Sequence, residues 1–286
     1  MLDFTPRHPF FVGIDSDGCA FDTMEVKHKE CFIPNTINSY NLQGVSKYAR
    51  EVAEFVNLYS KSRGINRFPA LIETLERLAR RPEVKARGVQ VSVPPGLAAW
   101  VQRETKLANP TLQLEVEATG DPDLAQALEW SVAVNEAVAR IVRGVPPFPY
   151  VRESLARLAE CADVIVVSAT PGEALRREWH EHQIDRYVRM ICGQEIGTKK
   201  ACLAVARQYP PGKALMIGDA PGDQQAAQAN GCLFFPITPG AEEQSWQRFF
   251  EDGLERFLRG DFTDAYQREL AAEFDRALPA VPPWER

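Results

Sequence analysis

Five short apolar runs, bounded by Gly, Pro or charged residues, stand out from the mixed pattern of the rest of the chain. Runs of this kind are typical of strands that are buried on both faces of a parallel sheet. Between the later runs, apolar positions recur at helical spacing. This alternation predicts βαβ units and an α/β fold with a doubly wound, Rossmann-like parallel sheet. The predicted strands span residues 10–14, 164–167, 187–191, 214–217 and 232–237, and the helices between them span 151–158, 174–182, 201–209 and 224–230.

A long stretch with helical patterns and almost no strand signal separates the first run from the second. It covers residues 24–148, and prolines break it into segments. A loop of this length without structure of its own is rare in a compact domain. We therefore expect an α-helical cap domain, 24–148, inserted into a discontinuous core made of 1–23 and 149–240. Pro146-Pro147-Phe148-Pro149 is the expected return hinge, because prolines keep a linker stiff and extended.

The last stretch of the chain, residues 241–286, mixes charged residues with aromatic residues at helical spacing. Amphipathic spacing of this kind is typical of helices that pack one face on a core. We expect a C-terminal helical extension that packs on the sheet domain.

Composition and charge exclude several classes of protein. The chain is 45% apolar and 25% charged, as in an ordinary globular protein. No apolar run approaches the roughly 18 residues that a membrane span needs, and no secretory signal follows Met1. The net charge of -6 disfavours nucleic acid and anionic membranes as partners. The six cysteines lack metal-binding spacing, so we expect reduced thiols in a cytoplasmic protein. The oligomeric state stays open between a monomer and a homodimer.

Polar and charged residues follow three of the predicted strands. Asp15-Ser16-Asp17-Gly18 follows the first, Ser168 the second, and Gly218-Asp219 the fourth, with Asp223 four residues later. Lys199-Lys200 precede the helix that leads to the fourth strand. In an open parallel sheet, functional groups collect at the carboxyl ends of the strands. We therefore expect these acids, the hydroxyl and one lysine at a common edge.

Clustered carboxylates raise each other's pKa values, so the cluster indicates either a bound divalent cation or a shared proton. Oxygen donors alone favour Mg²⁺. A magnesium ion beside a hydroxyl and an ammonium group suits phosphoryl transfer to or from a small phosphorylated metabolite. Asp15 and Asp17 are two residues apart and share a strand face. We expect Asp15 to be the nucleophile and Asp17 the general acid and base, while Ser168 and the lysine hold the phosphoryl oxygens.

Together, these motifs resemble those of the haloacid dehalogenase superfamily. Residues 15–18 match its first motif, Ser168 its second, Lys199 or Lys200 its third, and 218–223 its GDxxxD fourth. Residues 18–23 are similar to the DGVxxDT of branches with a helical cap after the first motif.

The resemblance implies a Mg²⁺-dependent phosphatase that forms an aspartyl phosphate. Its metal ligands would be the Asp15 carboxylate, the Asp17 backbone carbonyl and Asp219. The resemblance also implies that Asp223 is a direct or water-mediated ligand, or that it positions the lysine. A phosphomutase or phosphotransferase is the alternative, although the histidine that mutases of this superfamily place ten residues after the second acid is replaced here by Lys27.

Two further questions stay open at this level. The apolar pattern after residue 200 favours an inward-pointing Lys199 over Lys200. A non-catalytic receiver-like module would share the acids and the lysine, but its lysine closes the set, whereas here Asp219 and Asp223 follow it. Substrate contacts are expected from the residues that flank the motifs and from guanidinium groups of the cap, namely Gly18, Ala169, Arg63 and Arg67.

Overall fold

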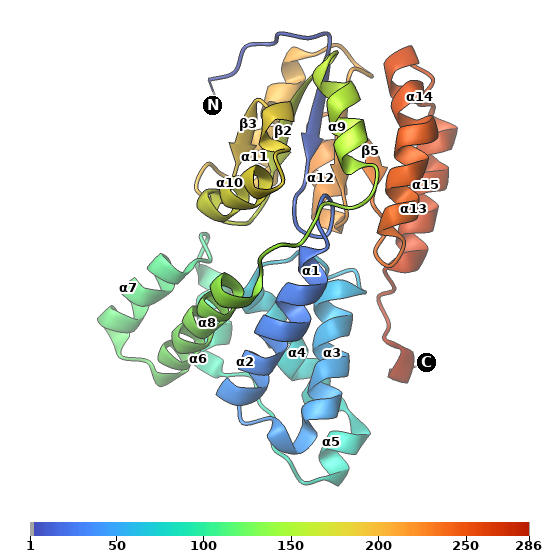
Figure 1. The fold of residues 1–286 in the computed structure, drawn as a ribbon. Helices are drawn as coiled ribbons and strands as arrows, with labels where there is room; N and C mark the ends of the chain where they lie inside the picture. Colours follow the sequence, from blue (N-terminus) through green and yellow to red (C-terminus); the bar gives the residue numbers. More distant parts are fainter. Residues whose placement is uncertain (1–2, 286) are drawn as a thin grey trace. The chain divides into compact units, whose positions relative to one another are not determined.

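The computed structural model describes residues 3–285, which divide into two compact units (Figure 1). The first unit contains residues 3–24 and Gly144–Pro279, and the second contains Glu25–Arg143 and residues 280–285. The chain therefore passes from one unit to the other at three places. Each unit has its own hydrophobic core.

The first unit is built on a five-stranded parallel sheet with the order β3-β2-β1-β4-β5. This confirms the predicted doubly wound α/β fold. The third strand begins later than the predicted 187–191, because Asp185–Tyr187 forms a 3₁₀ turn in which the Tyr187 amide donates to the Ile184 carbonyl at 3.2 Å. The strands are β1 (Phe10–Ile14), β2 (Ala162–Val167), β3 (Met190–Cys192), β4 (Ala214–Gly218) and β5 (Leu233–Pro236).

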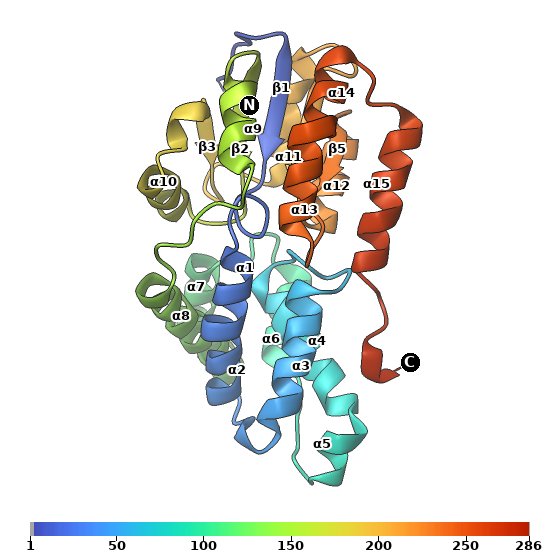
Figure 2. The same cartoon turned by 45° about the vertical axis from the view of Figure 1, so that its right-hand side comes forward.

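Successive residues of a strand point to opposite sides of the sheet, and the buried apolar side chains on each side are covered by helices. Val12 and Ile14 belong to the core beneath one layer of helices, and Phe11 belongs to the core beneath the other. Figure 2 shows α9, α13 and α14 in front of the sheet and α11 and α12 behind it. The helices of this unit are α9 (Val151–Ala159), α10 (Gly172–Glu181), α11 (Lys199–Cys202), α12 (Pro221–Ala229), α13 (Glu242–Arg248), α14 (Leu254–Arg259) and α15 (Asp264–Ala277).

The second unit is helical, as the sequence predicts for the insertion. Its core is rich in aromatic residues, and Phe68 packs edge-on against Trp100 and Trp130. No described helix in the chain is both long and apolar enough to cross a bilayer. The helices are α2 (Ile33–Ser39), α3 (Ser46–Leu58), α4 (Arg67–Arg80), α5 (Pro82–Ala86), α6 (Pro95–Arg103), α7 (Asn109–Thr119) and α8 (Pro122–Ile141), and the short α1 (Thr23–Val26) leads into them.

The division into units differs from the expected boundaries in three places, the smallest difference being that residue 24 belongs to the first unit. The first unit resumes at Gly144 rather than at residue 149, because Phe148 packs on the sheet core and its amide donates to the Ala20 carbonyl at 3.0 Å. The extension was expected to pack entirely on the sheet domain. Helices α13 to α15 do so, but residues 280–285 group with the second unit. There Trp284 lies edge-on to Phe55 and under the Arg81 guanidinium.

A buried carboxylate near the start of β2 ties the N-terminal segment to the sheet. Asp163 is fully buried and accepts hydrogen bonds from the Arg7 and His8 amides at 2.8 and 3.1 Å. Tyr209 Oη donates to it at 2.5 Å, and Arg189 Nη1 at 2.7 Å. Burial alone would raise the pKa of Asp163, but these hydrogen bonds hold it well below its usual value.

We expect Asp163→Asn to lower the free energy of unfolding by about 3 kcal/mol at pH 7, since it removes the charge of a fully buried carboxylate that pairs with Arg189. A carboxyl whose pKa is depressed in the folded state stabilises the protein above the unfolded pKa, and this stabilisation is lost as the pH falls. The difference in the free energy of unfolding between wild type and variant should therefore shrink below about pH 3.9. Urea unfolding from pH 7 to pH 3 measures it. A gap that stays constant over this range contradicts the assignment.

Candidate active site

The parallel register brings the ends of three strands together. Ile14 of β1 pairs with Val166 of β2 on one side and with Ile217 of β4 on the other. The residues that follow these strands therefore leave the sheet at the same edge. The strand order also reverses at β1, and this is where open α/β sheets bind ligands.

Three buried carboxylates meet at this edge. One oxygen from each of Asp15, Asp219 and Asp223 lies within 4.8 Å of the others. The three residues are only 5%, 1% and 0% exposed. Burial raises the pKa of Asp15 to about 6, with a further contribution from Asp223, while Lys199 opposes the shift. Burial likewise raises the pKa of Asp223.

The lysine of the site is Lys199. Its Nζ donates to Asp15 Oδ2 at 2.5 Å and to Asp223 Oδ1 at 2.7 Å. Burial opposes the charged ammonium, but the neighbouring carboxylates outweigh it and raise the pKa of Lys199 above its usual value. Thr198 caps α11 through a hydrogen bond from the Ala201 amide, which places Lys199 in the first turn. Lys200 is exposed, so of the two lysines it is Lys199 that contacts the buried acids.

Helix α12 brings Asp223 back against the end of β4. Two residues separate the end of the strand from the start of the helix, and Asp223 Oδ2 accepts from the Ala220 amide at 3.1 Å. A Cβ atom at Gly218 would lie only 2.5 Å from the Cβ and Cγ atoms of Asp223. Glycine at 218 is therefore required for the Asp223 carboxylate to approach the other acids.

The donor set fits a divalent cation. Three ionised carboxylates beside one ammonium leave two negative charges without compensation, in a buried position where such an excess is unfavourable. All the donors are oxygens, as hard ions such as Mg²⁺ prefer. The Asp17 carboxylate does not belong to this group of three.

Asp17 has different surroundings from Asp15. Its Oδ2 accepts from Thr170 Oγ1 at 2.5 Å, and its Oδ1 accepts from Thr23 Oγ1. The Thr170 amide in turn donates to Ser168 Oγ at 3.3 Å, which links Ser168 to Asp17. Sequence reasoning did not assign roles to Thr23 and Thr170. Thr23 ends the DGxxxDT stretch and Thr170 lies two residues after Ser168, so their proximity to the motifs was the available signal.

The expected substrate-contact residues fall into two groups. Gly18, in a left-handed conformation with φ 75°, and the exposed Ala169 belong to the loops of the first unit that carry Asp17 and Ser168. Arg63 and Arg67 belong to the second unit. Arg63 is 2% exposed, and its Nη1 donates to the Leu58 carbonyl at 2.8 Å, so it is engaged at the end of α3.

Arg67 has a different environment from Arg63. Its guanidinium lies over the Phe32 ring, 5.1 Å from the centroid, and Nη1 donates to Ser131 Oγ at 2.9 Å and Asn135 Oδ1 at 2.8 Å. No carboxylate pairs with it among the described residues. Burial lowers its pKa to about 10.

No family model and no curated protein matches the chain. Several solved structures do match. A haloacid dehalogenase-like hydrolase from Streptococcus pneumoniae is 13% identical, and the match covers 89% of this chain and 98% of that one with a TM-score of 0.47. A protein provisionally described as a phosphoglycolate phosphatase, from Lactobacillus delbrueckii, is 15% identical with 87% and 98% covered and a TM-score of 0.49.

A hydrolase of the same superfamily from Geobacter sulfurreducens, subfamily IA, is 15% identical, with 80% of this chain and 88% of that one covered and a TM-score of 0.38. Each of these three structures is at most 15% identical to this chain.

Proposed function

We propose that this protein is a Mg²⁺-dependent phosphatase that hydrolyses a small phosphomonoester through a phosphoryl group carried on Asp15. The main support is the position of Lys199 Nζ, which bridges Asp15 and Asp223 in a buried group of three acids. A carboxylate activated beside a fixed cation, with a second acid in separate surroundings, provides both a nucleophile and a proton donor.

In the first step, a carboxylate oxygen of Asp15 attacks phosphorus and the bond from phosphorus to the ester oxygen breaks. The Ser16 amide donates to Asp15 Oδ1 at 2.7 Å, which fixes the plane of the carboxylate. Asp17, in its protonated form, gives its proton to the leaving oxygen. The Thr23 and Thr170 hydroxyls hold the Asp17 carboxyl in one orientation while it does so.

In the second step, water attacks the phosphorus of the aspartyl phosphate. Asp17, now ionised, accepts a proton from this water, and the bond from phosphorus to the Asp15 oxygen breaks. Inorganic phosphate leaves, Asp15 regains its carboxylate, and Asp17 regains its proton. Lys199 offsets the negative charge of the phosphoryl oxygens, and in this proposal Ser168 Oγ donates to one of them.

The Asp15, Asp219 and Asp223 carboxylates, with the Asp17 backbone carbonyl, are the groups that would hold Mg²⁺. When bound, the ion supplies charge stabilisation to the transferring phosphoryl group. We expect dialysis against EDTA to lower turnover of p-nitrophenyl phosphate by at least about 10²-fold, with recovery on addition of Mg²⁺. Ca²⁺ should not restore it, because Ca²⁺ takes more ligands at longer distances.

Thermal unfolding provides a readout of metal binding that does not depend on turnover. An ion that binds only the folded state raises the unfolding temperature. Mg²⁺ should raise it for wild type and not for Asp219→Asn. Full turnover after EDTA treatment, together with an unfolding temperature that Mg²⁺ leaves unchanged, contradicts a metal-dependent function.

The remaining features of the function stay predictions. The Arg67 guanidinium, which has no carboxylate partner among the described residues, is our candidate for contact with the non-reacting part of the substrate. We further propose a cytoplasmic location, a small phosphorylated metabolite as the substrate, and a monomer or homodimer. Kinetics of Arg67→Lys with several phosphorylated metabolites test the proposed contact of Arg67 with the substrate, since loss of that contact raises KM and leaves kcat unchanged.

A further inference from the structure

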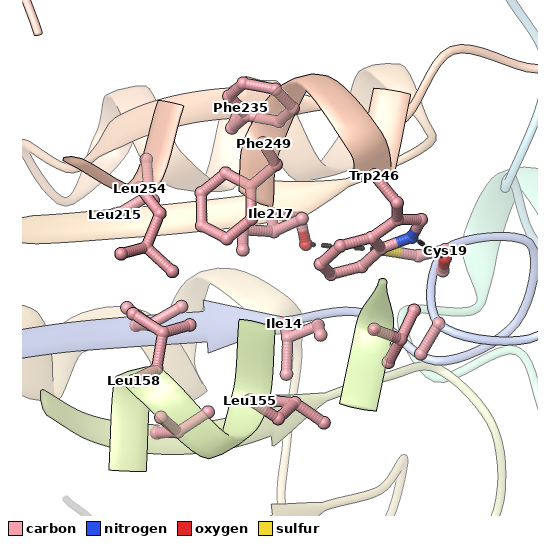
Figure 3. Close-up of a cluster of buried hydrophobic side chains, with 14 of the residues drawn as sticks. Ile14, Cys19, Leu155, Leu158, Leu215, Ile217, Phe235, Trp246, Phe249 and Leu254 are labelled. Carbon is pink, nitrogen blue, oxygen red and sulfur yellow. Dashed lines mark hydrogen bonds between the residues drawn. The ribbon is translucent and has the colours of Figure 1, made fainter. Parts of the chain in front are cut away.

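The loop after β1 is held by an indole group from the C-terminal part of the chain. Trp246 Nε1 donates to the Cys19 carbonyl at 2.7 Å, and both residues are fully buried (Figure 3). The two residues are 227 positions apart. A second indole, Trp179 Nε1, donates to Ser16 Oγ at 2.9 Å. Helices α13 and α10 therefore both hold the short loop that carries Asp15 and Asp17.

The loop itself is tightly bonded, so a contact at Cys19 fixes its neighbours. The Ala20 and Phe21 amides donate to the Ser16 carbonyl at 2.9 and 3.1 Å, and the Gly18 amide donates to the Phe21 carbonyl at 2.8 Å. Cys19 Sγ also contacts the Ile217 carbonyl of β4 at 3.6 Å. A shift at residue 19 therefore displaces the Ser16 carbonyl and the Gly18 amide, the peptide groups that flank Asp17.

The helix that carries Trp246 is firmly anchored on the sheet. Trp246 packs edge-on against Phe249, with ring centroids 5.7 Å apart, and Phe249 packs on Phe235 of β5 at 4.9 Å. Figure 3 shows these rings in one layer with Leu254 and Ile217. Helix α13 and the π-helical turn that follows it, Phe249–Gly253, thus connect the last strand of the sheet to the loop after the first strand.

We propose that α13 is a positioning element for the catalytic loop, and that the Trp246 indole is the positioning residue that sets the orientation of Asp15 and Asp17. The inference rests on the proposed phosphatase function. It assigns a role to the C-terminal extension, which follows all four catalytic motifs in the sequence. Loss of this hydrogen bond leaves the buried Cys19 carbonyl without its donor and loosens the loop, and small displacements of reacting groups strongly reduce rates.

Trp246→Phe removes the indole N–H and part of the ring. The matched control is Trp100→Phe, because Trp100 is equally buried but its Nε1 has no hydrogen-bond partner. With p-nitrophenyl phosphate, we expect Trp246→Phe to lower kcat about tenfold and to change KM less than twofold. Trp100→Phe should leave both constants within about twofold of wild type.

A second variant separates the hydrogen bond from packing. Benzothienylalanine at position 246 keeps the shape of the two fused rings and replaces the N–H by sulfur. It should reproduce the loss of kcat if the hydrogen bond is responsible. Normal kcat in this variant, with a loss only in Trp246→Phe, overturns the proposal in favour of a purely structural packing role.

Amide hydrogen exchange tests the inference without reference to turnover. The amides of residues 18–21 should exchange at least about tenfold faster in Trp246→Phe than in wild type, and at the wild-type rate in Trp100→Phe. Unchanged exchange overturns the proposal whatever the kinetics. Faster exchange in a protein whose wild type does not hydrolyse phosphate esters preserves the positioning role and rejects the phosphatase function, so the two failures are distinguishable.

Discussion

Asp15→Asn should reduce turnover of p-nitrophenyl phosphate by at least about 10³-fold, because an amide oxygen does not form the bond to phosphorus that the carboxylate forms. The variant should fold normally. Asparagine keeps the shape of the side chain and its oxygen still accepts from the Ser16 amide, although its NH2 group then replaces the oxygen that accepts from Lys199. Phosphate release under single-turnover and steady-state conditions, beside the unfolding temperature, measures both properties.

Two companion variants sharpen this test. Asp15→Ala should be equally inactive, which excludes slow conversion of asparagine to aspartate as a source of residual activity. Asp22→Asn is the matched control, because Asp22 is exposed and lies outside the group of three acids. It should retain activity within about twofold of wild type.

The proposed phosphoryl-enzyme can be detected directly. Asp17→Asn keeps the nucleophile but removes the base that activates water, so it should accumulate phosphoryl-enzyme after mixing with p-nitrophenyl phosphate, whose leaving group departs without a proton. Intact-protein mass spectrometry in acid should show one added phosphoryl group in Asp17→Asn and none in the double variant with Asp15→Asn. Wild-type turnover by Asp15→Asn contradicts the assignment of the nucleophile.

Replacement of Lys199 should have the second largest effect. Lys199→Met keeps most of the side-chain volume and removes the ammonium that bridges Asp15 and Asp223. We expect kcat to fall by about 10² to 10³-fold, the range typical of losing one preorganised group that stabilises transition-state charge. Lys200→Met should stay within about twofold of wild type, since Lys200 is exposed.

The Lys199 variant also tests the electrostatics of the site. Without the ammonium, the carboxylates lose the neighbour that opposes the rise of their pKa values. Binding of Mg²⁺ then becomes the main remaining compensation for the buried negative charge. The unfolding temperature of Lys199→Met should therefore rise more on addition of Mg²⁺ than that of wild type. Equal activity of the two lysine variants contradicts the assignment of Lys199.

Much of the candidate site could be read from sequence because its residues follow directly after apolar strands. The residues 15, 168 and 219 each come within two positions of a strand end, and parallel pairing brings such ends together. The choice of Lys199 over Lys200 depends on which residue of a short helix faces the acids. The apolar pattern after residue 200 favours Lys199, but a four-residue helix has few apolar positions, so the contacts of the folded chain were needed to distinguish the two lysines.

The contacts that hold the site residues in place could not be predicted from the sequence. The Thr23 and Thr170 hydroxyls that hold Asp17 come from segments almost 150 residues apart in the chain, and hydroxyls next to motifs have no distinctive pattern. Asp163 was likewise hidden, because a charged residue at the start of a buried strand is explained only by partners from the N-terminal segment and from Tyr209.

The sequence by itself determined which strands are followed by reactive side chains, the parallel α/β class and the presence of a helical insertion. Hydrophobic periodicity and motif spacing, on which these predictions rest, are local properties of the chain. Tertiary structure alone decided that Lys199 bridges two acids, that residues 280–285 leave the sheet domain, and that Trp246 reaches the Cys19 carbonyl. Such contacts depend on packing between distant segments, and their energies appear only once the chain is folded.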